Sequence, residues 1–196
     1  MNIHNESPNP NPNNSAIIDP AAAEIIAFWQ EAGPDKWFAK DPAFDVAFRD
    51  RFAGIYCQAV NGALSHWAAS PIGTLALTLL LEQYPRNAFR GTPWMYATDA
   101  MARLVAEHAL ALGYWDKVPA DLRMFLLLPF GHSERLADQE RSVGLAEEMI
   151  PESAHNARHH RDVVRSFGRF PHRNAILGRA STAEEQAYLD GGGYSG

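Results

Sequence analysis

The sequence predicts an all-α protein of about eight helices and no sheet. No run of about four to eight residues alternates apolar with polar side chains, as a half-buried strand would. Helix-capping signals recur along the chain, and alanine far outnumbers valine, which favours helix over strand. Residues 75–81 are apolar on every side, and a helix of that kind is typical of the centre of an antiparallel bundle.

Three helices are predicted to begin where a side-chain acceptor precedes a proline. The acceptor can cap the first turn, and the fixed φ of proline suits the first helical position. The pairs are Asp19-Pro20, Asp41-Pro42 and Ser70-Pro71. After the second pair, aromatic and aliphatic side chains recur at helical steps from Phe44 to Ala59, so we expect a long amphipathic helix that ends near Gly62.

The second half of the chain contains the signals of the remaining helices. They are expected from Thr98 or Asp99 to Gly113, from Asp121 until Pro129 ends the helix, from Ser133 to about Ile150, from Pro151 through Phe167, and from a capping box at residues 181–185 to Asp190. The helices would form a single domain over residues 19–193. The Asn/Pro-rich segment at residues 1–18 is expected to be disordered, because proline removes backbone donors and asparagine favours local turns.

The composition excludes several classes of protein. Of the 196 residues, 46% are hydrophobic and 11% are aromatic, which indicates a folded core. The net charge of −6 argues against nucleic acid and anionic membranes as partners, since both attract positive charge. The lone cysteine, Cys57, rules out a disulfide framework and a multi-cysteine metal cluster. Because no signal peptide or membrane-length apolar run is visible, we expect a cytoplasmic protein.

The charge is distributed unevenly. Residues 154–179 contain six arginines, four of the eight histidines and one acidic residue, Asp162, so this segment carries +5 and the rest of the chain −11. A guanidinium is a planar fork of donors that matches a carboxylate or a phosphate. Two interpretations stay open: the arginines pair with acidic helices and fasten the fold, or some of them form an anion-binding site.

One sequence pattern occurs twice. Arg-Asn-Ala-apolar-x-Gly is found at residues 86–91 and at residues 173–178, each time after an aromatic–proline pair. The two segments are either similar loops between one helix and the next, or a pair of loops that present arginines and asparagines to one site. Under the second interpretation, the ligand-binding candidates are Arg86, Asn87, Arg90, Arg169, His172, Arg173, Asn174 and Arg179.

The segment at residues 132–141 supplies candidates for a supporting layer. Gln139 and Glu140 interrupt the apolar face of the helix predicted there, and a buried carboxylate needs a partner. We therefore expect Glu140 to pair with an arginine of the late cluster or with Arg86. Together with Asp138 and Gln139, it would orient the ligand-binding arginines from behind.

His132 is the best acid/base candidate, because it lies in a loop where an imidazole can titrate near neutral pH. Glu134 or Asp138 would orient it. The alternative is a histidine that braces or caps the loop. No nucleophile motif such as Gly-x-Ser-x-Gly accompanies it.

The late histidines do not predict a metal site. His155 and His159 have helical i, i+4 spacing, but they lack the intervening glutamate of a His-Glu-x-x-His zinc site. His160 lies on the apolar side of its predicted helix, so we expect a hydrogen-bonded core histidine. We predict no metal and no other cofactor.

Four sequence blocks resemble one bacterial family, catalogued as domain of unknown function 924. The blocks are WFAKDPAFD at residues 37–45, LLEQYPRN with FRG at residues 80–91, HSE with ADQERSV at residues 132–143, and FGRFPHRN with LGR at residues 167–179. The resemblance extends from about Ile25 to Gly193. It implies an all-helical fold similar to tetratricopeptide-like arrays, and it implies no established activity. Glu82 and Tyr84 stand where the family often has Asp and Phe, and Gly131 replaces a larger residue.

Three functions are compatible with these residues. The first is a helical binding module in which the paired Arg-Asn loops hold a small anionic molecule or a peptide. The second is a hydrolase-like acid/base enzyme that uses His132. The third is an interaction domain in which the arginine–carboxylate pairs are purely structural. The oligomeric state is left open.

Overall fold

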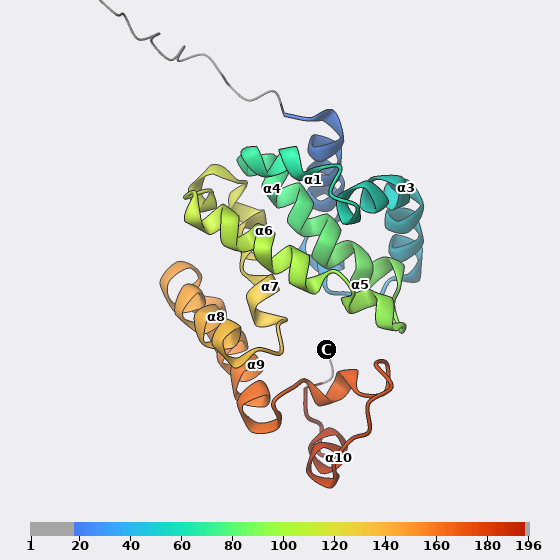
Figure 1. Ribbon diagram of the computed structural model, residues 1–196, viewed down its shortest axis with the longest axis vertical. Coiled ribbons are helices and arrows are strands. Elements are labelled where there is room, and N and C mark those ends of the chain that lie inside the picture. The colour runs from blue at the N-terminus through green and yellow to red at the C-terminus, as the bar shows by residue number, and fades with distance from the viewer. Residues whose placement is uncertain (1–17, 195–196) are drawn as a thin grey trace, which may run out of the picture.

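A computed structural model describes residues 18–194 and confirms the all-α prediction, with one domain and no strand in that range (Figure 1). The tail predicted to be disordered falls, apart from Ile18, on residues 1–17, outside the described part of the chain. Within residues 18–194, no helix combines the length and the apolar character needed to cross a bilayer. The tetratricopeptide-like arrangement implied by the family resemblance stays a prediction.

The first helices begin at the predicted capping residues. Asp19 accepts a hydrogen bond from the backbone of Ala21 at 2.9 Å, and Asp41 accepts one from Ala43 at 3.0 Å. The carboxylates thereby satisfy amides that have no partner within the helix. The helices that follow are α1 at Pro20–Ala32, α2 at Pro34–Trp37 and α3 at Pro42–Val60.

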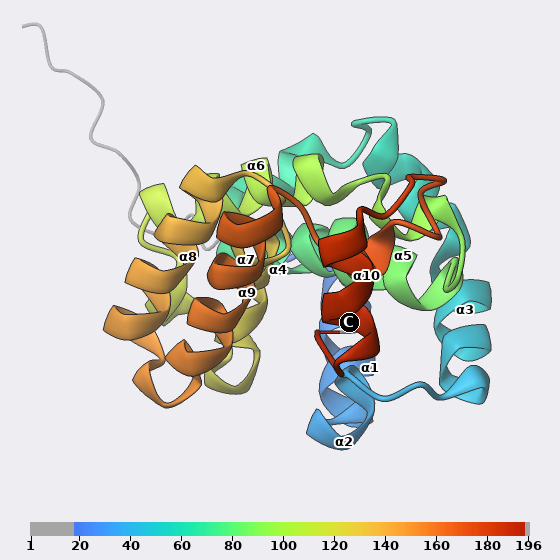
Figure 2. The same ribbon diagram turned by 90° about the horizontal axis from the view of Figure 1, so that it is seen from below.

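The centre of the molecule is one continuous helical rod. It consists of α4 at Pro71–Thr78, a wider π-helical segment at Leu79–Gln83, and α5 at Tyr84–Ala88. As predicted from its apolar character, residues 75–81 are buried, and α1, α3 and α6 pack around them (Figures 1 and 2). Aromatic rings fill the space between α1 and α3, where Trp29 and Phe48 lie 5.2 Å apart between centroids.

The π-helical segment has a clear cause in the sequence. Pro85 has no N–H, so it cannot donate the α-helical hydrogen bond to the carbonyl of Leu81. The hydroxyl of Thr98 donates to that carbonyl instead, at 2.5 Å. The helix widens just before the proline, with the amide of Tyr84 bonded to the carbonyl of Leu79. The polar pair Glu82 and Gln83 lies in this widened turn, and both residues are buried.

The second half of the chain departs from the expected boundaries in three places. Residues 121–129 do not form one short α-helix: a 3-10 segment at Ala120–Leu126 is followed by the short helix α7 at Leu128–Gly131, in which Pro129 occupies the first turn. The helix expected from Ser133 begins only at Leu136, and a 3-10 turn precedes the helix expected from Pro151. The elements are α6 at Asp99–Ala111, α8 at Leu136–Met149, α9 at Ala154–Phe167 and α10 at Ala183–Asp190. The predicted capping box of α10 is present at Thr182 and Glu185.

The C-terminal third is packed separately from the main core. Helices α8 and α9 lie side by side next to α7, and the chain then runs below the end of the central rod, as seen in Figure 1, before it enters α10 (Figures 1 and 2). Val163 and Val164 of α9 form a small apolar cluster with Phe170, against which Tyr188 and Tyr194 pack. This arrangement places the late arginines and histidines opposite the end of the central rod.

The capping role of Thr98 can be tested by replacing it with valine, which keeps the shape and removes the hydroxyl. We expect Thr98→Val to lower the free energy of unfolding by about 1–3 kcal/mol, because a buried carbonyl loses its donor. The matched control is Thr78→Val, since the hydroxyl of Thr78 donates to Thr74 within an intact helix. Urea unfolding should show the larger loss for Thr98→Val, and equal losses would contradict the role assigned to Thr98.

Candidate functional site

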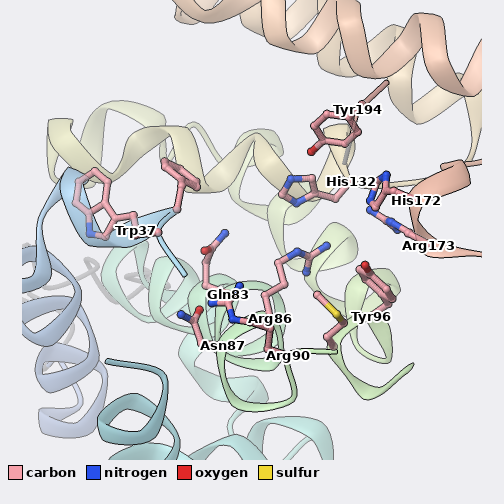
Figure 3. Close-up of a pocket in the computed structure, with 13 residues that line it drawn as sticks. Trp37, Gln83, Arg86, Asn87, Arg90, Tyr96, His132, His172, Arg173 and Tyr194 are labelled. Atoms are coloured by element: carbon pink, nitrogen blue, oxygen red, sulfur yellow. The ribbon is translucent and has the colours of Figure 1, made fainter. Parts of the chain in front are cut away.

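A cavity of about 180 Å³ lies between the end of the central rod and the C-terminal third (Figure 3). Gln83 and Arg86 reach it from the rod, and His172, Arg173 and Tyr194 reach it from the late segments. The remaining lining residues come from the α2 loop, from α5 and the loop after it, and from the end of α7. They are Trp37, Phe38, Ala39, Asn87, Arg90, Met95, Tyr96 and His132.

A second cavity of about 390 Å³ adjoins the first. Tyr96, His132 and Arg173 line both of them. Asp99 and Glu134 line only the second. The three shared side chains therefore stand at the boundary between the two spaces and are the residues best placed to contact a bound molecule.

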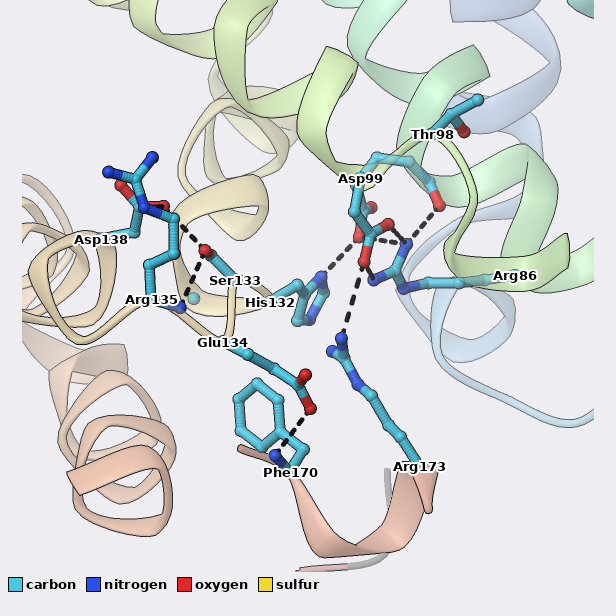
Figure 4. Close-up of polar contacts among 12 residues, drawn as sticks. Arg86, Thr98, Asp99, His132, Ser133, Glu134, Arg135, Asp138, Phe170 and Arg173 are labelled. Carbon is cyan, nitrogen blue, oxygen red and sulfur yellow. Dashed lines mark hydrogen bonds and ion pairs between the residues drawn. The ribbon is translucent and has the colours of Figure 1, made fainter. Parts of the chain in front are cut away.

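Arg86 is fully engaged by acceptors of the protein. Its guanidinium donates to both carboxylate oxygens of Asp99, at 2.7 and 3.0 Å, and to the backbone carbonyl of Glu82 at 2.8 Å (Figure 4). It also lies 2.9 Å from the carboxylate of Glu82, one helical turn earlier. Such a bidentate, buried arrangement fixes the guanidinium in place, so Arg86 acts first as a structural cation.

Glu82 is a buried carboxylate that three donors surround. Its side chain is 1% exposed, and it accepts hydrogen bonds from Nδ1 of His132 at 2.5 Å and from the amide of Gln83. Burial alone would raise the pKa of Glu82, but Arg86 and His132 outweigh that effect and hold the pKa at about 2. Glu82 is therefore ionised at neutral pH and accepts the Nδ1 hydrogen of His132.

His132 sits at the end of α7, where its backbone amide donates to Leu128 at 2.9 Å. Because Nδ1 donates to a carboxylate, Nε2 of the neutral ring is an acceptor. In the described part of the chain, no hydrogen bond involves Nε2, and the side chain lines both cavities. The orientation by Glu134 or Asp138 that the sequence suggested is wrong, because the orienting carboxylate is Glu82 of the central rod.

The two carboxylates first considered for that role have other partners. Glu134 accepts two hydrogen bonds from Arg179, at 2.7 and 2.9 Å, and one from the backbone of Phe170 at 2.8 Å. Asp138 accepts one from the hydroxyl of Ser133 at 2.7 Å and lies 3.3 Å from Arg103. The carboxylates of Glu134 and Asp138 are therefore occupied by these donors. The carboxylate that binds His132 is that of Glu82, which comes much earlier in the chain.

Gln139 and Glu140 also lie differently from the sequence-based expectation. Gln139 is buried, but its amide donates to the carbonyls of Gly131 and Ser133, at 2.7 and 2.6 Å, so it braces the His132 loop. Glu140 is exposed and pairs with Arg165 at 2.5 Å. An arginine of the late cluster is thus its partner, as expected, but the pair lies on the surface and orients no residue of the cavity.

Most of the predicted ligand-binding residues are paired within the protein. Asp45 binds both Asn87 and Arg90, and Glu185 binds both Arg169 and Asn174. Arg179 is paired with Glu134, as above. Of the two Arg-Asn segments, Arg86, Asn87 and Arg173 line one cavity, whereas Asn174 is buried away from it.

Arg173 is the exception among the six late arginines. Five of them have a carboxylate oxygen within 2.8 Å, but the nearest one to Arg173 is Oδ2 of Asp99, at 3.7 Å. Its side chain is only 7% exposed, and its Nε has no hydrogen-bond partner among the described residues. Tyr96 and Phe170 enclose the guanidinium, with ring centroids at 4.4 and 4.6 Å. Burial, with Arg86 nearby, lowers the pKa of Arg173.

Two further histidines are neutral: His172 lines the first cavity, whereas His160 lies beside Tyr194 and lines neither cavity. Burial lowers the pKa of His160 to about 3 and that of His172 to about 4. The ring of His160 lies 4.6 Å from Tyr194 and 5.8 Å from Phe170 between centroids. His160 is only half-buried, and no hydrogen bond in residues 18–194 involves its ring, so the hydrogen-bonded core histidine expected from the sequence is not observed. Within the same range, no three potential metal-ligating side chains come together.

The comparisons with known proteins agree with the family resemblance. The sequence profile described as "Bacterial protein of unknown function (DUF924)" matches residues 25–193. A solved structure of a protein of unknown function from Agrobacterium tumefaciens is similar to the chain, with 49% sequence identity and a TM-score of 0.84. The match covers 87% of this chain and 97% of the other. No curated protein matches the sequence significantly.

The depressed pKa of His160 predicts acid sensitivity of the fold. An unfolded histidine has a pKa near 6.5, so below that pH the unfolded chain binds a proton that the folded chain does not, and stability falls with pH. At pH 5.5, His160 should cost about 1 kcal/mol relative to pH 7.5. Urea unfolding at both pH values should show this loss in the wild type and a loss smaller by that amount in His160→Phe. The exposed control His155→Phe should behave as the wild type, and equal pH dependence of all three would refute the assignment.

Proposed function

We propose that this protein, which belongs to the bacterial DUF924 family, binds a small anionic molecule in the cavity beside Arg173, in the cytoplasm. The observation that carries the proposal is Arg173 itself: a buried guanidinium with an unused donor and a distant carboxylate, at the boundary of two cavities.

The energetics of Arg173 support a ligand. A buried charge without a close partner is unfavourable, and the pair with Asp99 at 3.7 Å offsets this only in part because Asp99 already binds Arg86 at 2.7 and 3.0 Å. A carboxylate in the cavity would supply the missing acceptors and neutralise the cation. Charge-assisted hydrogen bonds of this kind are the strongest that a guanidinium forms.

The walls of the cavity indicate what else the ligand carries. Three apolar side chains line part of it, Trp37, Phe38 and Met95, and Phe38 is 59% exposed. Arg173, His172 and the phenol of Tyr96 lie across the cavity from Trp37 (Figure 3). This amphipathic lining fits a small carboxylate with an apolar or aromatic body better than it fits a bare inorganic ion.

A purely structural role explains the other arginines but not Arg173. Arg86, Arg90, Arg169 and Arg179 each hold a carboxylate within 2.7 Å and join segments that are distant in sequence. Arg173 joins nothing at comparable distance. Its enclosure by two aromatic rings keeps it positioned without neutralising its charge.

The proposal can be tested with Arg173→Met, measured by isothermal titration calorimetry with acetate, benzoate and inorganic phosphate. Among the three anions, we expect the wild type to bind benzoate most tightly. The variant should bind it about 10- to 100-fold more weakly, because hydrogen bonds to a charged group contribute a free energy of that size. Because the variant removes a poorly compensated buried charge, its free energy of unfolding should stay within about 1 kcal/mol of the wild type.

The matched control is Arg90→Met. Arg90 lines the same cavity, but its guanidinium is already paired with Asp45. This control variant should retain benzoate affinity. If Arg173→Met unfolds the protein as strongly as a broken buried ion pair would, by about 3–5 kcal/mol, Arg173 is structural. If the wild type binds none of the three anions, the proposed function is wrong.

A further inference from the structure

We infer that the same cavity is a hydrolytic active site for small carboxylic esters, with His132 as the acid/base group and Arg173 as the oxyanion donor. The inference rests on the proposed function, because the carboxylate product would be the anion that Arg173 binds. Glu82 is the positioning residue, and Arg86 holds Glu82 in place.

The geometry of the Glu82–His132 pair is that of an acid/base histidine held by a carboxylate. An ionised carboxylate that accepts from Nδ1 fixes both the tautomer and the ring orientation of a histidine, and it stabilises the imidazolium that forms when Nε2 takes up a proton. Glu82 meets these conditions at 2.5 Å, with 1% of its side chain exposed and with Arg86 at 2.9 Å. Nε2 is on the opposite edge of the ring, which lines both cavities.

Both members of the Glu82–His132 pair are held by structure beyond their own contact. The carboxylate of the pair lies in the π-helical turn before Pro85, a local distortion of a kind that often marks functional sites. The loop that carries His132 is fastened from the other side by Gln139, which donates to the carbonyls on both sides of the histidine. A histidine that served only to cap α7 would need neither a buried carboxylate nor this support.

The charge of the site also fits an ester. Among the cations that line the first cavity, Arg173 alone lacks a carboxylate within 3 Å, so the site offers one guanidinium that is only partly neutralised. Hydrolysis of an ester develops a single negative charge on the carbonyl oxygen, which matches one guanidinium. A phosphate group carries nearly two charges and would call for a second free cation.

The reaction follows from these positions. Nε2 of His132 takes a proton from a water molecule whose oxygen bonds to the ester carbonyl carbon, and the π electrons of the carbonyl move onto its oxygen beside Arg173. When the carbonyl re-forms, the bond between carbon and the alcohol oxygen breaks, and the His132 imidazolium returns its proton to the departing oxygen. Water and ester become alcohol and carboxylic acid, with no other reactant. The acid ionises to the carboxylate that Arg173 binds.

The experiment measures release of 4-nitrophenolate from 4-nitrophenyl acetate and 4-nitrophenyl butyrate by the full-length protein. We expect saturable turnover, with kcat lowered at least 100-fold in His132→Gln, within the usual range for loss of an acid/base group. Glu82→Gln should lower kcat with little change in KM, and Glu82→Asp should restore part of it. The control His155→Gln, an exposed histidine outside both cavities, should be unchanged.

Two measurements keep the test decisive if a variant folds poorly. Carbethoxylation of the wild type with diethyl pyrocarbonate, mapped to His132 by peptide mass spectrometry, should abolish turnover without any substitution. The proton NMR spectrum should show a strongly downfield Nδ1 hydrogen that is absent in Glu82→Gln, as expected for a short bond to a carboxylate.

The outcomes separate this inference from the proposed function. Turnover that is absent in the wild type, or that persists in carbethoxylated protein or in His132→Gln, overturns the catalytic role. If benzoate binding that depends on Arg173 is nevertheless present, the proposed anion site stands alone. If benzoate does not bind but turnover depends on His132, then Arg173 does not hold the product, and the oxyanion role assigned to it is wrong.

Discussion

The need to compensate buried charge governs how this protein is assembled. A small set of ionisable side chains is enclosed between the central rod and the C-terminal third. Two carboxylates in this set contact two guanidiniums and an imidazole, and one of the guanidiniums lies farther from its carboxylate than the other. The members are Glu82, Arg86, Asp99, His132 and Arg173. Since ion pairs of this kind are stable only when every partner is present, α5, α6, α7 and the segment around Arg173 must meet in one geometry. Specificity of the fold and chemistry of the site therefore come from the same interactions.

Much of the fold follows from local chemistry. Asp19, Asp41 and Ser70 begin helices as predicted, because capping is decided within a few residues. The π-helical turn and the late start of α8 were not predicted. The first depends on Thr98, which approaches Leu81 only in the folded chain, and the second on the turn that Ser133 makes with Asp138. The Thr98 contact is tertiary, whereas Pro85 and the bond between Ser133 and Asp138 act locally, through specific contacts that helix propensity does not contain.

The sequence indicated which residues could form the candidate site, but not how they pair. The late arginines raised the question of their partners, and His132 was proposed as an acid/base group from its place in a loop. Its carboxylate partner could not be chosen, since Glu134 and Asp138 are near in sequence whereas Glu82 is near in space. The available signal was a lone charged residue, Glu82, directly after a wholly apolar helix, where a carboxylate requires a buried counter-charge.

The division of the cavity between the central rod and the late segments has a consequence for biosynthesis. The main core draws on residues up to Leu126, so it can begin to pack while the ribosome is still translating the rest. The wall formed by His172, Arg173 and Tyr194 emerges last. Most of the main core is therefore synthesised before one wall of the cavity, and the cavity can be complete only after the C-terminal segment has been added.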